Sequence, residues 1–317
     1  MKIVFFEVSK AEEKILKGLL EDKDVLFFEE KLDENNVEKA KDAEIVCVFV
    51  KSAISKSVID AMPNLKFITT RSTGFDHIDY EYAKTKDIKV SNVPAYGSET
   101  VAEFAFALLL TLSRKIREAS QALKENGNYS IPKDVQGFDL DKKTLGVIGT
   151  GKIGKNVIHI ARGFNMNVLA YDLYPDLNFA KENNFIYKTL EEVLSQSDIV
   201  TLHAPYTKEN HHLINKNNIS LFKKGAYLLN TARGELVETE ALVRALEDGT
   251  IAGAGLDVLE EEGKFKKGDI IPMLEMRNVV MTPHIAFDTC EAEARIMQTT
   301  VENIKGFIAS NPINLVK

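Results

Sequence analysis

Three glycines in the middle of the chain, Gly149, Gly151 and Gly154, follow an apolar run with the spacing G-x-G-x-x-G. In this spacing the first glycine permits a tight turn out of a strand, the second lets a pyrophosphate approach the backbone, and the third lets the next helix pack closely on the sheet. Free N–H groups in the first turn of that helix face the phosphates. Because an ordinary strand–turn–helix connection does not require three glycines, the segment predicts a dinucleotide-binding turn.

An acidic residue follows at the distance that such a turn requires. Asp172 ends a second apolar run about 20 residues beyond the glycines, where its carboxylate can accept hydrogen bonds from an adenine-ribose diol. A carboxylate there repels a 2′-phosphate, and the next residues, Leu173, Tyr174 and Pro175, include no Arg or Lys to receive one. The sequence therefore favours NAD over NADP, with an exposed aspartate in an ordinary turn as the alternative.

Three further side chains, Arg233, Glu262 and His284, come after predicted strands of the same series. Open α/β sheets bind ligands at the carboxyl ends of their strands, so all three are expected at one edge of one sheet. Hydride transfer to a 2-keto acid leaves an oxyanion that needs a proton, which a histidine titrating near neutrality can supply. A carboxylate favours and orients the protonated imidazole, and an arginine binds a substrate carboxylate through a planar bidentate fork.

Each of these residues also has a simpler explanation. An arginine after a strand is often part of a surface ion pair, and the three consecutive glutamates at 260–262 suit a solvated turn. Their position in one dinucleotide sheet favours a common catalytic site. Two other histidines, His211 and His212, lie in a Lys- and Asn-rich stretch without a Cys or Asp at ligand spacing, so no metal site is predicted.

Two series of alternating strands and helices must position these residues. The first has predicted helices at 11–20 and 57–61 and predicted strands at 2–6, 25–28, 45–50, 67–70 and 89–91. The second has a helix at 152–164 and six strands, at 145–148, 167–171, 199–202, 226–230, 252–256 and 279–281. This alternation predicts an α/β fold with parallel sheets covered by helices, and the six strands match a full dinucleotide-binding sheet.

The segment 98–123 connects the two series. Thr100 and Glu103 have the spacing of a capping box, and residues 101–112 are apolar nearly all round. A helix without a polar face is buried on every side, which predicts a position between domains or in a subunit interface. The alternative is a central core helix of one domain.

Composition sets the remaining limits. A chain of 317 residues suits two domains, and a net charge of −7 argues against nucleic acid or an anionic membrane as the main partner. The two cysteines lie far apart, the first residues form a strand rather than a signal peptide, and the longest apolar run is too short for a membrane span. These features predict a cytoplasmic protein.

The chain resembles the D-isomer-specific 2-hydroxyacid dehydrogenases over essentially its whole length. The motifs that carry the resemblance lie at residues 72–79, 92–103, 149–154, 230–234, 255–262 and 282–284. Within the family, residues 93–96 and 284–287 are most similar to D-lactate dehydrogenases. The resemblance implies two Rossmann-like domains with parallel sheets. The N-terminal one is flavodoxin-like and completed by the C-terminal helix. It also implies a substrate-binding (catalytic) domain at 1–97 plus 290–317 and an NAD-binding domain at 98–289.

The same resemblance implies a role for particular residues. His284 is the acid/base, Glu262 its partner, and Arg233 a substrate ligand, although the three adjacent glutamates leave the choice among Glu260, Glu261 and Glu262 open. Substrate contacts are expected from the N–H groups of Thr73 and Gly74 and from Arg233, Tyr96 and Phe287. The expected NAD contacts are Gly149, Thr150, Gly151, Lys152, Ile153, Gly154, Asp172, His203, Pro205, Thr231, Asp257 and His284. A homodimer built partly on 98–123 is also implied.

These expectations lead to an NAD-dependent enzyme that reduces pyruvate to D-lactate. The enzymatic alternatives are a hydroxypyruvate or glyoxylate reductase and a 3-phosphoglycerate dehydrogenase. A phosphorylated substrate needs extra cations, for which Arg71 is the candidate in the substrate loop, unless that side chain pairs with an acid. A non-catalytic NAD-sensing interaction protein is the alternative from a different functional class.

Overall fold

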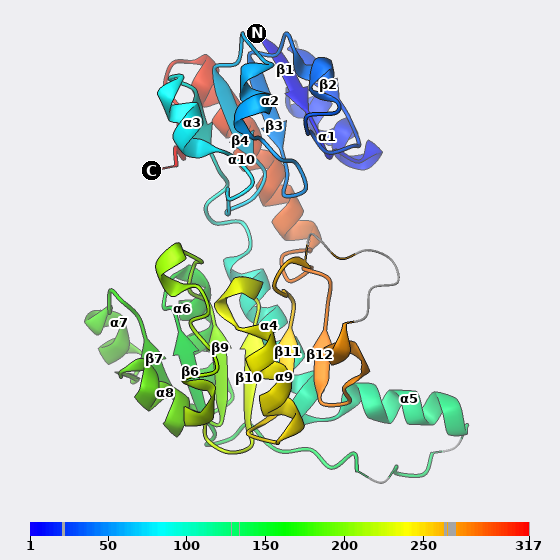
Figure 1. The fold of residues 1–317 in the computed structure, drawn as a ribbon, viewed down its shortest axis with the longest axis vertical. Helices are drawn as coiled ribbons and strands as arrows, with labels where there is room; N and C mark the ends of the chain where they lie inside the picture. Colours follow the sequence, from blue (N-terminus) through cyan, green and yellow to red (C-terminus); the bar gives the residue numbers. More distant parts are fainter. Residues whose placement is uncertain (21–22, 128, 133, 263–264, 266–270, 317) are drawn as a thin grey trace. The chain divides into compact units, whose positions relative to one another are not determined.

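The computed structural model describes residues 1–317 except 21–22, 128, 133, 263–264, 266–270 and 317. The chain folds into two compact units, each with its own sheet (Figure 1). The first unit consists of Met1–Tyr96 and Thr289–Lys317, and the second of Gly97–Asp288. Each of the two boundaries between the units lies one residue earlier in the chain than the boundary predicted from the sequence.

The first unit contains a parallel five-stranded sheet with the order β2-β1-β3-β4-β5, which is the flavodoxin-like order. Its strands are β1 (Lys2–Phe5), β2 (Asp24–Phe27), β3 (Ile45–Val48), β4 (Phe67–Thr70) and β5 (Lys89–Ser91). Its helices are α1 (Lys10–Leu19), the 3-10 helix η1 (Val37–Ala40), α2 (Lys56–Asp60), α3 (Tyr80–Thr85) and α10 (Cys290–Ile308).

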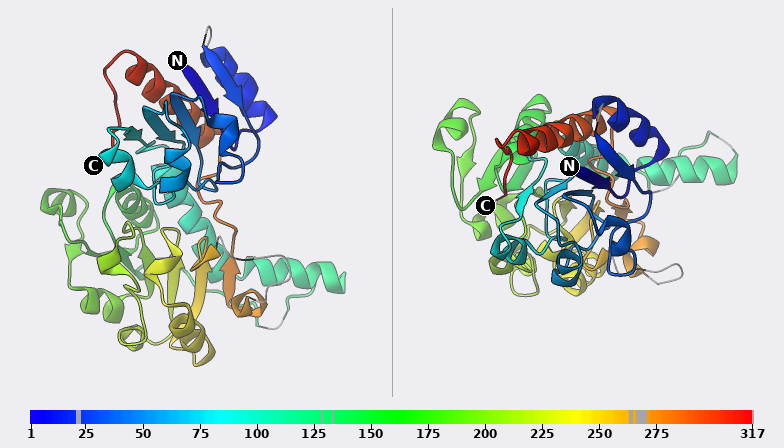
Figure 2. Two further views of the ribbon diagram at one scale, coloured as in Figure 1. Left: turned by 45° about the horizontal axis from the view of Figure 1, so that its top comes forward. Right: turned by 90° about the horizontal axis from the view of Figure 1, so that it is seen from above.

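Both faces of the central part of this sheet are buried, which is why β1 and β3 are nearly continuous apolar runs. Successive residues of a strand point to opposite faces of the sheet. Ile3 and Phe5 therefore pack with α1 and α10 on one face, whereas Val4 and Phe6 pack with α2 and α3 on the other face. The last helix, α10, packs on β4 and α1 and thereby completes the N-terminal fold, as predicted. In both views of Figure 2 it lies alongside the strands of this unit.

The second unit contains a parallel seven-stranded sheet with the order β12-β11-β10-β9-β6-β7-β8. Its strands are β6 (Thr144–Ile148), β7 (Asn167–Tyr171), β8 (Ile186–Tyr187), β9 (Ile199–Leu202), β10 (Ala226–Asn230), β11 (Ile251–Leu256) and β12 (Val279–Met281). The order reverses at β6, as in a Rossmann sheet. The sequence predicted six strands, and the sheet has seven. The missed strand is β8 at the edge of the sheet, whose two residues are too short to give an alternating or apolar run.

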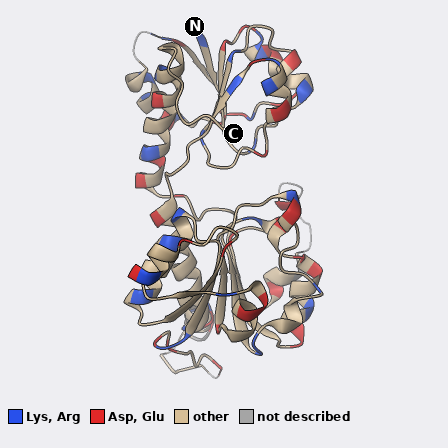
Figure 3. Ribbon diagram, turned by 90° about the vertical axis from the view of Figure 1, so that its left-hand side faces the viewer, with Lys and Arg blue, Asp and Glu red and all other residues tan. Residues whose placement is uncertain are grey.

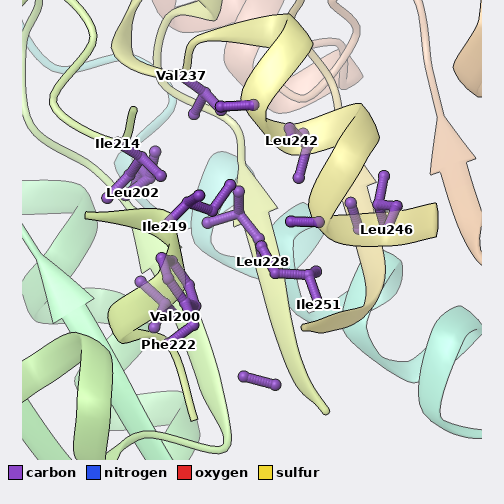
Figure 4. Close-up of a cluster of buried hydrophobic side chains, with 14 of the residues drawn as sticks. Val200, Leu202, Ile214, Ile219, Phe222, Leu228, Val237, Leu242, Leu246 and Ile251 are labelled. Carbon is purple, nitrogen blue, oxygen red and sulfur yellow. The ribbon is translucent and has the colours of Figure 1, made fainter. Parts of the chain in front are cut away.

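The helices of the second unit cover both faces of this sheet. They are α4 (Ser98–Ser113), α5 (Ile116–Asn126), α6 (Lys152–Gly163), α7 (Leu177–Glu182), α8 (Leu190–Gln196) and α9 (Thr239–Glu247), with 3-10 helices η2 (Lys208–Asn210), η3 (Ile219–Leu221), η4 (Gly234–Leu236) and η6 (Pro272–Glu275). One core cluster, with α8 and α9, contains Val200, Leu228 and Leu242 (Figure 4). The other contains residues of α4 and α6.

The segment 98–123 differs from its prediction in two respects. It forms two helices, because Lys115 adopts a left-handed conformation (φ 52°) between α4 and α5. The prediction of a capping box at Thr100 and Glu103 was wrong, because α4 begins at Ser98 and its N-cap residue is Gly97. Within its unit α4 packs on α6, β10 and β11. These contacts agree with the alternative prediction, a central core helix of one domain. In Figure 1, α5 projects from the sheet of this unit.

Residues of both charges, Lys and Arg as well as Asp and Glu, are interspersed along the helices (Figure 3). Among the described residues, no helix has both the length and the apolar content to cross a membrane.

Candidate active site

The glycine-rich turn joins β6 to α6 and has the geometry that its three glycines make possible. Gly149 has a φ of 91°, and a Cβ there would lie 2.5 Å from the Ala204 nitrogen. A Cβ on Gly154 would lie 2.1 Å from the Gly149 carbonyl oxygen, so this glycine lets the helix close on the turn itself. A Cβ on Gly151, at the N-cap of α6, would meet nothing within 4 Å. The turn therefore leaves open space beside Gly151, where the pyrophosphate is expected.

Asp172 follows β7 and is bonded to this turn. Its Oδ2 accepts hydrogen bonds from the Thr150 N–H (2.6 Å) and the Thr150 hydroxyl (2.8 Å), and its Oδ1 accepts one from the Tyr174 N–H (2.8 Å). The Tyr187 hydroxyl lies 2.9 Å from the Thr150 hydroxyl. Tyr187 was not predicted, because it belongs to the short strand β8.

Two predicted cofactor contacts at the ends of neighbouring strands have buried polar atoms without a hydrogen-bond partner among the described residues. They are His203 Nδ1, after β9, and Thr231 Oγ1, after β10. Burial lowers the pKa of His203 to about 3, so its ring is neutral, and its Nε2 lies 2.8 Å from Thr201 Oγ1. Unpaired buried polar atoms are rare in folded proteins, and a bound group often supplies the missing partner. With the open space at Gly151, these atoms fit a dinucleotide along this edge of the sheet.

The other predicted cofactor contacts lie nearby in the chain: Lys152 and Ile153 form the first turn of α6, and Pro205 is exposed beyond β9.

Asp257, after β11, is buried and has a different set of contacts. Its carboxylate accepts hydrogen bonds from the Thr282 hydroxyl (2.6 Å) and the N–H groups of Ile285 (2.9 Å) and Ala286 (2.8 Å). Asp257 therefore holds the loop that carries the predicted acid/base.

His284 lies in that loop, after β12, with a left-handed backbone (φ 55°). Its Nδ1 lies 2.5 Å from Glu262 Oε1. Because a carboxylate only accepts, Nδ1 carries the proton, and Nε2 is left to face a ligand. Burial raises the pKa of Glu262, but the hydrogen bond and charge of His284, with smaller effects from the Leu259 N–H and the Arg233 charge, outweigh it and hold the pKa below its usual value.

Arg233 is placed beside this pair by an unusually close approach of two loops. A Cβ on Gly234 would lie 2.1 Å from the Leu259 carbonyl carbon and 2.3 Å from the Glu260 nitrogen. The Asn230 side chain fixes the same turn, because it donates to the Arg233 carbonyl (2.8 Å) and accepts from the Ala232 N–H (3.0 Å). The three predicted catalytic residues thus lie on adjacent loops at the carboxyl ends of β10, β11 and β12.

The contacts of Glu260 distinguish it from Glu262. Its carboxylate bonds His212 Nε2 (2.5 Å) and the Thr239 N–H (2.7 Å), and so joins the loop to the start of α9. Ligand atoms of His211, His212 and Glu260 all lie within 4.8 Å of one another. However, the ring centres of the two imidazoles are stacked 3.8 Å apart with planes 24° apart, and His212 Nε2 is already bonded to Glu260. The arrangement suits a hydrogen-bonded support for the loop.

The predicted substrate loop lies in the first unit, after β4. Thr73 Oγ1 donates to the Val93 carbonyl (2.8 Å), and the Tyr96 carbonyl accepts from Arg295 (2.6 Å). Phe287, in the second unit, has its ring centre 6.5 Å from that of His284. Arg71 is buried, where it pairs with Glu12 and donates to the carbonyls of Phe6 and Glu7. Of its two predicted roles, the structure therefore shows the pairing with an acid.

Comparison with known proteins identifies the class that this fold and site define. Residues 106–286 match the NAD-binding domain of the D-isomer specific 2-hydroxyacid dehydrogenases. The chain is 36% identical to D-lactate dehydrogenase of Escherichia coli over 318 residues, covering 96% of each protein. It is 38% identical to glyoxylate reductase of Korarchaeum cryptofilum over 284 residues, covering 88% of this chain and 84% of that one.

A solved structure extends the similarity to the whole fold. D-Lactate dehydrogenase of Aquifex aeolicus, complexed with NAD and lactic acid, has a TM-score of 0.91 and 39% identity, and the match covers 99% of each chain. The protein belongs to the D-isomer-specific 2-hydroxyacid dehydrogenase family. It is an NAD-dependent oxidoreductase.

Proposed function

We propose that this enzyme reduces pyruvate to D-lactate with NADH. The observation that carries the proposal is the hydrogen-bonded pair of His284 and Glu262 beside Arg233, at the ligand-binding edge of a dinucleotide sheet. The D-lactate dehydrogenases among its relatives, one of which is complexed with lactic acid, support pyruvate as the substrate.

The roles of the residues follow from their chemistry. Bound NADH supplies a hydride to the keto carbon. The Arg233 guanidinium binds the substrate and polarises the carbonyl, while His284 Nε2 donates the proton that the developing alkoxide requires. Glu262 stabilises the protonated imidazole and fixes its orientation through Nδ1. We assign the substrate carboxylate to the N–H groups of Thr73 and Gly74, and we propose Tyr96 and Phe287 as further substrate contacts.

The cofactor residues act through the contacts described above. We assign the pyrophosphate to the backbone beside Gly151 and the first turn of α6, and the adenine ribose to Asp172. We propose His203 Nδ1 and Thr231 Oγ1 as further contacts, since both atoms are buried and have no hydrogen-bond partner among the described residues.

Glyoxylate or hydroxypyruvate is the second candidate substrate, since a relative of nearly equal identity is named glyoxylate reductase. A phosphorylated substrate is disfavoured, because Arg71 is 2% exposed and already paired with Glu12. A role in NAD sensing alone would leave the pairing of Glu262 with His284 without a purpose.

We also propose a homodimer built partly on residues 98–123. Support comes from α5, which projects from its unit and exposes the apolar side chains Ile116 (53%) and Leu123 (39%). Light scattering of the wild type and of an Ile116→Asp, Leu123→Asp variant tests this, with a monomeric wild type as the result that contradicts it.

The decisive experiment measures NADH oxidation with pyruvate, hydroxypyruvate, glyoxylate and 3-phosphohydroxypyruvate in parallel, with NADPH as the control. We expect the highest kcat/KM with pyruvate and NADH. His284→Ala should lower kcat by roughly 10²–10⁴, the usual contribution of general acid catalysis. Turnover of none of these acids, despite NADH binding, would instead favour a sensor.

A further inference from the structure

Two backbone N–H groups in the loop after β4, those of Thr73 and Gly74, donate no hydrogen bond to any residue that the structure describes. The carbonyl on the other side of each of these two peptides is, in contrast, bonded. Ser72 O accepts from the Val93 N–H (3.0 Å), and Thr73 O accepts from the Asn92 side-chain amide (2.7 Å).

These carbonyl contacts determine where the free N–H groups point. A trans peptide is planar, so its C=O and N–H point in opposite directions. A bond that fixes Ser72 O therefore aims the Thr73 N–H, and a bond that fixes Thr73 O aims the Gly74 N–H. Both N–H groups are thus turned away from residues 92–93, and each is available to an anion.

The two peptides differ in what holds their carbonyl groups. The carbonyl of the Ser72–Thr73 peptide is held by a backbone N–H, whereas the carbonyl of the Thr73–Gly74 peptide is held by a side chain, that of Asn92. This second peptide also precedes Gly74, a residue with little conformational preference of its own, so the peptide needs an external restraint to keep one orientation. A carbonyl oxygen only accepts, so the atom of Asn92 that meets Thr73 O is Nδ2.

Asn92 is itself held by the C-terminal part of the chain. The Asn303 amide on α10 donates to the Asn92 carbonyl (2.9 Å), and the Asn92 N–H donates to the Asn314 carbonyl (3.2 Å). The Asn314 amide in turn donates to Asn303 Oδ1 (2.8 Å). Asn303 is fully buried, so this set of bonds is shielded from competition by water.

We propose that Asn92 is a positioning residue for the carboxylate of the 2-keto acid substrate. It holds the Thr73–Gly74 peptide so that the Gly74 N–H faces the carboxylate, and Asn303 and Asn314 hold Asn92. The inference rests on the proposed function, because it uses the assignment of the substrate carboxylate to these two N–H groups. It adds a residue of the loop before α4, and two residues of the C-terminal segment, to those that set substrate affinity.

The test is Asn92→Asp, which keeps the shape of the side chain but replaces the donor with an acceptor facing Thr73 O. We expect KM for pyruvate and Kd for oxamate, an unreactive carboxylate analogue, to rise about 10- to 100-fold, in keeping with the loss of one hydrogen bond to a charged group. The kcat at saturating pyruvate and the Kd for NADH should stay within about threefold, since neither depends on this N–H; a general loss of structure would change all four.

Two further variants make the result specific. Asn36→Asp is the matched control, because the Asn36 amide also donates to a backbone carbonyl, that of Lys31, in the same unit but elsewhere. Asn314→Ala loosens Asn303 without touching the loop and should raise KM in the same direction by a smaller factor. It also provides the test if Asn92→Asp does not fold.

The outcomes separate this inference from the proposed function. If the wild type turns over keto acids and neither Asn92→Asp nor Asn314→Ala changes KM or the oxamate Kd, the inference is wrong and the proposed function stands. If the wild type turns over no keto acid, the proposed function fails, and the oxamate Kd values still decide whether Asn92 positions an anion. If the wild type with NADH binds no oxamate, the inference is wrong, and if it also turns over no keto acid, both are overturned.

Discussion

The Cα atom of Gly234 lies so close to Leu259 that a Cβ added to it would sit 2.1 Å from the Leu259 carbonyl carbon. The neighbouring atoms are backbone, which cannot swing aside as a side chain can. The loops that carry Arg233 and Glu262 are therefore in contact only because residue 234 has no side chain.

Gly234→Ala should consequently separate these two loops. We expect a loss of stability of about 1–3 kcal/mol, as for other overpacked positions, and a fall in kcat/KM of at least about tenfold. Thermal unfolding and steady-state kinetics check both. Gly163→Ala is the control, since a Cβ there meets nothing within 4 Å, and equal activity of the two variants would contradict the prediction.

Gly151→Ala should change the stability of the protein little but weaken the binding of NADH. Its Cβ finds open space in the protein alone and its backbone is extended (φ −66°, ψ −165°), so we expect a change in stability of no more than about 1 kcal/mol, the cost of a poorer N-cap. The same Cβ occupies the space assigned to the pyrophosphate, so the Kd for NADH should rise at least about tenfold. Fluorescence titration measures it, and an unchanged Kd would place the phosphates elsewhere.

Replacing Glu262 with Gln should change the pH profile of the enzyme. The lowered pKa of Glu262 keeps this group ionised well below neutrality, so its support of His284 is present above the usual value of 4.5 and is lost only as the pH falls through the lowered pKa. The neutral amide of Glu262→Gln does not favour a protonated imidazole. The deficit in kcat/KM of Glu262→Gln relative to the wild type should therefore be fully present above about pH 4.5 and shrink as the pH falls through the lowered pKa of Glu262.

Parallel profiles for the wild type and Glu262→Gln would contradict this account. Glu235→Gln is a suitable control. Glu235 lies in η4, after β10, and among the described residues its carboxylate accepts no hydrogen bond from His284, so the substitution should leave the profile unchanged.

The buried ring of His203 predicts a pH-dependent stability of the protein without cofactor. Burial lowers its pKa from 6.5 to about 3, so between these values the unfolded chain takes up a proton that the folded protein does not. Stability should therefore fall as the pH decreases below 6.5, by up to about 1.4 kcal/mol per pH unit from this group. Urea unfolding of the wild type and His203→Asn at several pH values isolates the effect, because other acid groups contribute equally to both. Curves of equal slope would refute it.

The strands and the glycine turn could be predicted from the sequence because local chemistry determines them. Strands such as β3 and β9 are fully buried and therefore appear in the sequence as short apolar runs, and the three glycines have fixed geometric roles. The edge strand β8 and the break at Lys115 have no such local signal. Lys115 adopts a left-handed conformation without being Gly or Asn, the residues that usually mark one.

The contacts that organise the site were harder to predict because they join distant parts of the chain. Asn303 and Asn92 are 211 residues apart, and the two loops that meet at Gly234 follow different strands. A polar residue such as Asn92 or Asp257 shows in sequence that it is a hydrogen-bonding group, but its partner depends on the tertiary fold. The Glu262–His284 pair was anticipated from the chemistry and strand-end positions of the two residues and from the family resemblance, and its catalytic role stays a prediction.

The return of α10 to the first sheet has a consequence for how the protein is made. Chains emerge from the ribosome N-terminus first, and domains generally fold as units. The seven-stranded unit is complete once Asp288 has emerged, whereas the unit that begins at Met1 lacks Met297, Val301 and Ile304 of its core until α10 follows. The part of the protein that is synthesised first is therefore expected to finish folding last, and until α10 emerges α1 alone among the described helices covers this apolar face of its sheet.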